Sequence, residues 1–125
     1  MAIDDKYAKM WLADGILYFV YNPIRCIDLP IAEEVVFQRL KLQNGIEYPV
    51  LCDLRAVQGA TKDARDYLAI SGSLLTKAQA FLVKDNYSLS VLNMYLRTTV
   101  VKPPTQIFDD ENRALAFLSE FRRVI

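Results

Sequence analysis

Short apolar runs that alternate with helical patterns are the feature that most restricts the fold of this chain. The runs EYPVLCDLR (47–55), AQAFLVK (78–84) and TQIFD (105–109) lie between stretches whose apolar residues recur at helical spacing. The first two runs are too short for helices and suit strands that are buried on both faces of a sheet. Strands separated by helices predict a sheet with a parallel part, whose crossovers are right-handed.

An aromatic segment near the N-terminus adds an antiparallel hairpin to this pattern. In KMWLADGILYFVY (9–21), two aromatic and branched stretches flank an Asp-Gly pair. Such a pair supplies the positive φ angles of a tight turn, so strands are expected at about 7–13 and 16–21. The strands place three large aromatic residues in the sheet, where they either pack or stack on a ligand: Trp11, Tyr18 and Tyr21.

Start and stop signals predict helices between and after the strands. Asp28 is expected to cap the first helix, Pro30 to lie in its first turn and Gly45 to end it. The later helices are expected from Thr61 to about Lys77 with a bend or early fraying at 71–73, after a cap at Ser88, and from a cap at Asp109 or Asp110 to about Arg123. The predicted order is therefore ββαβαβαβα, an α/β fold with a mixed sheet, in one domain over residues 1–125.

The ionisable residues exclude several classes of function. The 15 Lys and Arg balance the 15 Asp and Glu, so no basic surplus exists for nucleic-acid binding. Histidine is absent, which removes Ser-His and Cys-His nucleophile pairs and every His-ligated metal site. We therefore expect no catalytic residues, no metal and no cofactor. An enzyme would have to use Asp53, Tyr67 or Lys84 as its acid or base.

Cysteine usage and the lack of long apolar segments bear on location. Cys26 and Cys52 form no CxxC pair, and Cys52 lies inside an apolar run, as a buried free thiol does. No basic segment leads into an apolar stretch at the N-terminus, and no apolar run approaches the roughly 18 residues of a membrane span. We expect a soluble, cytoplasmic protein without a membrane span.

Charged residues gather in the turn after the strand at 47–55 and in the helix start that follows. One interpretation is a helix capped by Thr61 with solvated side chains around it. The other is a docking surface for a protein partner or regulator, formed by Arg55, Thr61, Lys62, Asp63 and Arg65. The free N–H groups of the helix start could also bind an anion. Gly59-Ala60-Thr61 lacks the spacing and the lysine of a phosphate-binding loop, however.

Asp53 and three basic residues form a second group of interest. A carboxylate inside an apolar strand needs a partner, so Asp53 is expected to accept hydrogen bonds from backbone or from a basic residue at the strand end. Arg55 and Lys84 are expected at strand ends on the same edge of the sheet, with Lys102 close by. These three residues form either a solvated rim or a positive lip for an anionic head group.

Two segments resemble a known family. VLCDLRAVQGATKDARDYLAI (50–70) looks like the strand, turn and helix of the STAS domain, which sulfate transporters and anti-sigma-factor antagonists share. PPTQIFDDENRALAFL (103–118) resembles the ending of small bacterial SpoIIAA-like proteins of the STAS/SEC14 type. By pattern, the resemblance covers nearly the whole chain, and it implies a SpoIIAA-like fold.

The resemblance also implies a non-enzymatic domain that binds partner proteins or small ligands. In the anti-sigma-factor antagonists, a serine at the start of this helix is phosphorylated, and Asp63 stands at that position here. Our leading hypothesis is a regulatory module that docks an unidentified protein through this turn. The alternative is a SEC14-like carrier or sensor of a small apolar or amphipathic ligand. A homodimer through an exposed edge of the hairpin is a further expectation.

Overall fold

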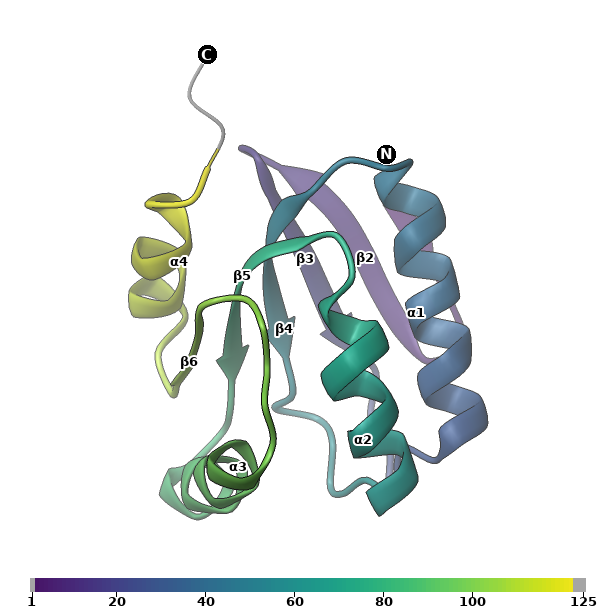
Figure 1. Ribbon diagram of the computed structural model, residues 1–125, viewed down its shortest axis with the longest axis vertical. Coiled ribbons are helices and arrows are strands. Elements are labelled where there is room, and N and C mark those ends of the chain that lie inside the picture. The colour runs from purple at the N-terminus through teal and green to yellow at the C-terminus, as the bar shows by residue number, and fades with distance from the viewer. Residues whose placement is uncertain (1, 123–125) are drawn as a thin grey trace.

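A computed structural model describes residues 2–122, and within them six strands form one sheet with helices on both faces (Figure 1). The strands are β1 (Ala2–Asp4), β2 (Ala8–Ala13), β3 (Ile16–Tyr21), β4 (Tyr48–Asp53), β5 (Thr76–Leu82) and β6 (Thr105–Phe108). The helices are α1 (Leu29–Gln43), α2 (Lys62–Ile70), α3 (Asn86–Thr98) and α4 (Glu111–Ser119), with a 3₁₀ turn, η1 (Ser71–Ser73), after α2. The predicted mixed α/β order is confirmed, with β1 as an additional strand.

Strand order in the sheet follows chain order from β1 to β6. The first three strands pair antiparallel, and the pairs from β3 to β6 are parallel. The hairpin turns at Asp14 (φ 53°) and Gly15 (φ 77°), as the Asp-Gly prediction requires. The three residues of β1 cover the edge of β2. A strand of three residues is too short to show the alternation of apolar and polar residues from which strands are predicted. The expected homodimer stays a prediction. The hairpin edge that suggested it, the outer edge of β2, is paired with β1.

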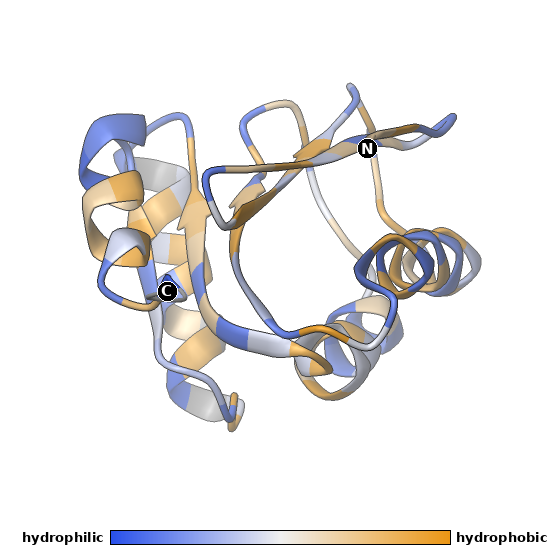
Figure 2. Ribbon diagram, turned by 90° about the horizontal axis from the view of Figure 1, so that it is seen from above, coloured by the Kyte–Doolittle hydropathy of each residue, from blue (hydrophilic) through white to orange (hydrophobic). Residues whose placement is uncertain are grey.

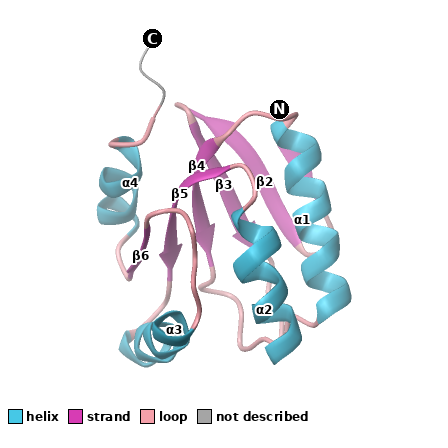
Figure 3. Ribbon diagram, viewed as in Figure 1, coloured by secondary structure: helices cyan, strands magenta, loops and turns pink. Residues whose placement is uncertain are grey.

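The helices divide between the two faces of the sheet. Seen from above in Figure 2, α1 and α2 lie on one side of the sheet and α4 lies on the other. In Figure 3, α3 lies below the strands, beyond the ends at which β4 and β5 point. Side chains alternate between the faces along each strand, as strand geometry requires. We call the two sides the α2 face and the α4 face.

Each face has its own apolar core. On the α4 face, Leu51, Ala80 and Leu82 pack against Ala114 and Leu118 of α4. The core of the α2 face is centred on the hairpin and α1 and includes Met10, Leu17, Phe19, Val35 and Ala64. Tyr21 is buried on this face with 4% exposure, so it cannot support a dimer from the outside of the hairpin. Tyr18 stacks on Trp11 with ring centroids 5.1 Å apart.

Three of the predicted helix ends are confirmed in the first and last helices. Asp28 caps α1 by accepting a hydrogen bond from the Ile31 amide at 3.0 Å. The helix ends in two left-handed residues, Asn44 (φ 49°) and Gly45 (φ 80°). At the other end of the chain, Asp110 caps α4. None of the described helices is both long and apolar enough to span a membrane.

Three other predicted helix bounds differ from the structure. One is the end of the last helix, which comes at Ser119 and not at about Arg123, a residue outside the described range. The second helix ends at Ile70 instead of Lys77, because the residues of η1 favour a tighter turn and Lys77 belongs to β5. The third helix begins earlier than predicted. Asp85 caps it by accepting from the Ser88 amide at 2.8 Å, so Ser88 lies inside the helix.

Candidate functional site

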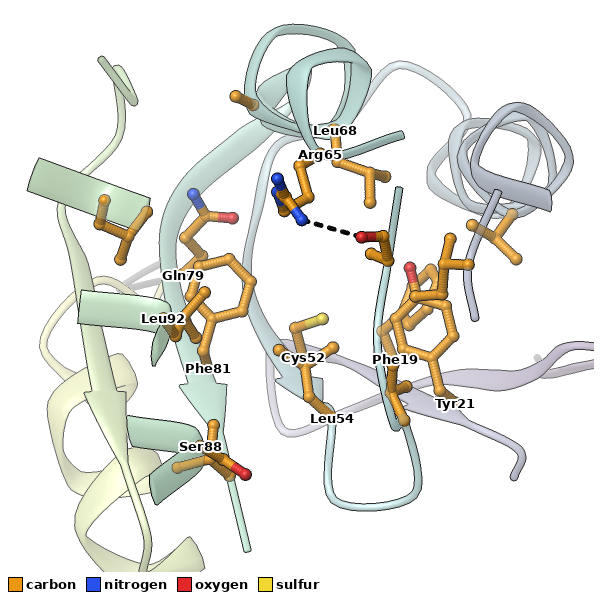
Figure 4. Close-up of a pocket in the computed structure, with 18 of the residues that line it drawn as sticks. Phe19, Tyr21, Cys52, Leu54, Arg65, Leu68, Gln79, Phe81, Ser88 and Leu92 are labelled. Atoms are coloured by element: carbon orange, nitrogen blue, oxygen red, sulfur yellow. Dashed lines mark hydrogen bonds between the residues drawn. The ribbon is translucent and has the colours of Figure 1, made fainter. Parts of the chain in front are cut away.

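A cavity of about 650 Å³ lies on the α2 face, between the sheet, α2 and α3 (Figure 4). Phe19, Cys52 and Phe81 contribute its walls from three neighbouring strands, Leu68 comes from α2 and Leu92 from α3. The volume falls within the roughly 300–1,000 Å³ that is typical of small-molecule sites. We call this cavity the pocket.

The pocket exists because α2 packs mainly on α1 instead of on the parallel strands. Two buried side chains of α1 fix this arrangement, and we call them the α1 clamp: Arg39 and Gln43. Arg39 donates to the carbonyls of Gly72 and Leu74, each at 3.0 Å. Gln43 donates to the Leu75 carbonyl at 2.8 Å and also accepts from Arg39. These bonds tie the segment after α2 to α1.

Polar groups enter the pocket at a few places. The guanidinium of Arg65 points from the first turn of α2 into the pocket, and its Nη1 donates to the Ala60 carbonyl at 2.8 Å (Figure 4). Gln79 of β5 is 7% exposed and donates through Nε2 to the Thr105 hydroxyl at 3.0 Å. Among the described residues that line the pocket, Arg39 and Arg65 carry positive charge and none is acidic.

Burial controls the protonation of the groups in the pocket wall. It raises the pKa of the Cys52 thiol to about 12, so at neutral pH this sulfur is protonated and is a poor nucleophile. Burial also raises the pKa of the Tyr21 phenol well above its ordinary value and lowers the pKa of Arg39. The predicted free thiol at Cys52 is confirmed, although the residue is half-buried because it borders the pocket.

Asp53 and Arg55 lie away from the pocket. Asp53 is 6% exposed and accepts from the Arg55 backbone amide at 3.0 Å and from Arg55 Nη2 at 2.7 Å. The predicted partner of this carboxylate is thereby confirmed. The hydrogen bond to Asp53 raises the pKa of Arg55. Arg55 Nη2 also lies 3.4 Å from Glu111 Oε1, which connects the end of β4 to the start of α4.

The remaining residues of the predicted docking surface lie at the start of α2. Thr61 caps the helix, since its hydroxyl oxygen accepts from the Ala64 amide at 3.3 Å. The Thr61 hydroxyl also donates to Asp63, which lowers the pKa of that carboxyl. Lys62 and Asp63 are exposed. A docking role for the predicted surface stays a prediction. Within it, Arg55 contacts Asp53 and Glu111, and Arg65 donates to the Ala60 carbonyl.

Two of the three residues of the predicted basic lip lie at the same edge of the sheet, as expected, and the third does not. Arg55 and Lys84 follow the carboxyl ends of β4 and β5, whereas Lys102 lies in the loop before β6 begins. In that loop, the Pro104 carbonyl accepts from the Gln79 amide at 2.9 Å. Because β6 runs parallel to β5, the residues before β6 lie at the opposite end of the sheet from those after β5. Lys102 is therefore far from Lys84. Arg55, which also belongs to the expected lip, is paired with Asp53.

Sequence reasoning missed most of the pocket. Gln79 is a polar residue inside an apolar strand and could have been noticed as Asp53 was. Arg39 and Gln43 stand four residues apart on a helix face that otherwise reads as apolar, which is a signal for a buried polar pair. Ser88 and Leu92 could not be placed, because the distance between α3 and the sheet depends on packing.

Comparisons with known proteins bear on the family and the fold. The family model described as "Domain of unknown function (DUF7793)" matches residues 10–122. No curated protein matches the chain. Among solved structures, it is similar to an uncharacterised DUF3478-family protein from Shewanella loihica PV-4, which has a SpoIIAA-like fold. The two share 15% sequence identity with a TM-score of 0.64, over 89% of this chain and 91% of that one. The predicted SpoIIAA-like fold is thus confirmed.

Proposed function

This chain belongs to the DUF7793 family, and we propose that it is a non-enzymatic binding module whose pocket holds a small apolar or amphipathic molecule. The observation that carries the proposal is the roughly 650 Å³ cavity with aromatic and aliphatic walls from both the sheet and the helices. A ligand that fills it is stabilised by roughly 0.8 kcal/mol for each methylene group removed from water.

The position of the titratable groups supports binding without catalysis. Asp53, Tyr67 and Lys84 are the residues that an enzyme would have to use, and none of them lines the pocket. Asp53 is turned to the α4 face and is engaged by Arg55. Cys52 does line the pocket, but its thiol stays protonated at neutral pH because burial raises its pKa to about 12.

Binding of a neutral fluorescent probe, N-phenyl-1-naphthylamine, tests the proposal. Ala69 of α2 borders the pocket, and Ala69→Trp should fill it, whereas Ile70 beside it is 76% exposed and Ile70→Trp should leave it open. We expect the wild-type protein and Ile70→Trp to bind the probe, and Ala69→Trp to bind it at least about tenfold more weakly, a change of roughly 1.4 kcal/mol.

Two outcomes would contradict this function. The wild-type chain could fail to take up the probe, and native mass spectrometry of the purified protein could show only the apo mass. Alternatively, Ala69→Trp could bind as well as Ile70→Trp, in which case the probe binds elsewhere. Circular dichroism of both variants controls for folding.

A further inference from the structure

The charges in the pocket wall have one sign. Arg39 and Arg65 line the pocket, and among its described lining residues there is no carboxylate. The acidic residues of α2 lie on its outer side, where Asp63 accepts from Thr61 and Asp66 pairs with Lys62 at 2.8 Å. The charged side chains that line the pocket are therefore both positive.

The two arginines differ in what they offer to a ligand. Arg39 is 3% exposed, and its guanidinium donates to the Gln43 side chain and to the Gly72 and Leu74 carbonyls. It therefore contributes charge to the wall without extending into the pocket. Arg65 is half-buried and extends its guanidinium into the pocket, where its Nη1 donates to the Ala60 carbonyl (Figure 4). The planar fork of a guanidinium matches the oxygen pairs of carboxylates and phosphates.

From this arrangement we infer that the ligand is a single-chain amphiphile with an anionic oxygen head group, a carboxylate or a phosphate. The head lies at Arg65, and the chain lies against Phe19, Phe81 and Leu92. A guanidinium in the wall attracts an anionic oxygen head group and repels a cationic one, so an anionic head is favoured and a cationic one is opposed. This inference rests on the proposed function and adds the chemical class of the ligand.

Matched head groups on one chain length test the inference. Dodecanoate, dodecyl phosphate, dodecanol and dodecylamine would each displace N-phenyl-1-naphthylamine at neutral pH, below their micelle concentrations. We expect the two anions to bind roughly ten- to a hundredfold more tightly than dodecanol, as a charge-assisted hydrogen bond predicts, and dodecylamine to bind most weakly. The stronger of the two anions identifies the head group. Acetate and inorganic phosphate, which have no chain, should not displace the probe.

Substitutions at Arg65 assign the effect to that residue. Arg65→Gln should reduce the preference for dodecanoate over dodecanol to about onefold, and Arg65→Lys should keep part of the preference. Arg97→Gln removes the same charge from the exposed side of α3 and should change neither affinity. If thermal unfolding shows that Arg65→Gln is unstable, the preference for dodecanoate over dodecanol is measured with Arg65→Lys instead.

The outcomes separate this inference from the proposed function. Equal binding of dodecanol and dodecanoate would overturn the anionic head group but leave a binding pocket in place. If the preference survives in both Arg65 variants, the assignment to Arg65 is wrong. If none of the four amphiphiles binds, both the inference and the proposed function fall.

Discussion

The α4 face and the α2 face of the sheet are made by alternate residues of the same strands, yet they bury their side chains differently. On the α4 face, Ala80 of β5 is fully buried and Leu118 of α4 packs close to it. On the α2 face, the next residue, Phe81, borders the pocket instead of a helix. The same backbone thus supports a closed core on one side and a cavity on the other.

The difference shows that the distance of a helix from a sheet depends on what else holds the helix. Alanines in β5 allow α4 to approach closely. On the other face, the bonds of the α1 clamp fix the segment after α2 from the side, and α2 rests on α1. A pocket is therefore kept open by polar contacts at its border.

The largest expected effect is on packing. Leu118→Ala removes a fully buried side chain from the α4 face and should lower the free energy of unfolding by about 3 kcal/mol. Leu68→Ala in the pocket wall should cost less than about 1 kcal/mol, because its side chain already borders empty space. Urea unfolding followed by circular dichroism measures both. Similar losses would show that the two faces are packed alike.

Removal of the α1 clamp should be the next largest effect. Gln43→Leu deprives Arg39 of an acceptor and the Ile46 and Leu75 carbonyls of a donor, which should lower the free energy of unfolding by about 2 kcal/mol. Gln38→Leu on the same helix loses only a bond to Glu34 and should change it by less than about 0.5 kcal/mol. If Gln43→Leu is as mild as its control, the pocket does not depend on the clamp.

Alkaline pH should destabilise the protein through a group on the α2 face. The pKa of the Cys52 thiol rises from its ordinary value of 9.0 to about 12 in the folded chain. The stabilisation that this gives is complete below about pH 9 and is lost as the pH rises toward 12. Between pH 8 and about pH 10.5, the free energy of unfolding should fall by roughly 2 kcal/mol.

Cysteine variants separate the source of this pH dependence. Cys52→Val should remove much of the alkaline loss, and Cys26→Val, at an exposed position, should not. Tyr21 contributes in the same direction above about pH 10, because burial raises the pKa of its phenol as well. Equal pH dependence in the two variants, measured by urea unfolding, would contradict the role of Cys52.

The smallest expected effect concerns the start of α2. Thr61→Ala removes the helix cap and should lower the free energy of unfolding by about 1 kcal/mol, while Thr61→Ser should change little. The same change should raise the pKa of the Asp63 carboxyl toward its ordinary value, because the Thr61 hydroxyl no longer donates to it. NMR titration measures that pKa. An unshifted Asp63 in Thr61→Ala would show that the hydroxyl does not contact it in solution.

Local signals in the sequence were sufficient for most of the fold. The Asp-Gly turn, the cap at Asp28 and the buried run of β4 each depend on neighbouring residues, and each is confirmed. The error at Ser88 arose because two capping residues, Asp85 and Ser88, stand close together, and the acid makes the bond. The short β1 depends wholly on its pairing with β2.

The site was harder to predict because it depends on distances between elements. Arg65 was predicted as part of an exposed surface, and nothing in its neighbours indicates that its side chain turns inward. Arg55 is exposed as expected, and it also provides the predicted basic partner of Asp53 two residues before it. The sequence indicates which residues carry charge, but the sheet decides to which face each charge is directed.

The alternation of β5 has a consequence for how proteins of this kind diverge. Phe81 and Gln79 determine the shape of the pocket, whereas Ala80 and Leu82 between them hold α4 in place. Selection for a new ligand can therefore act on every second residue of a strand while the intervening residues preserve folding. One segment of the gene encodes two nearly independent traits, so mutations that change binding need not pass through an unstable intermediate.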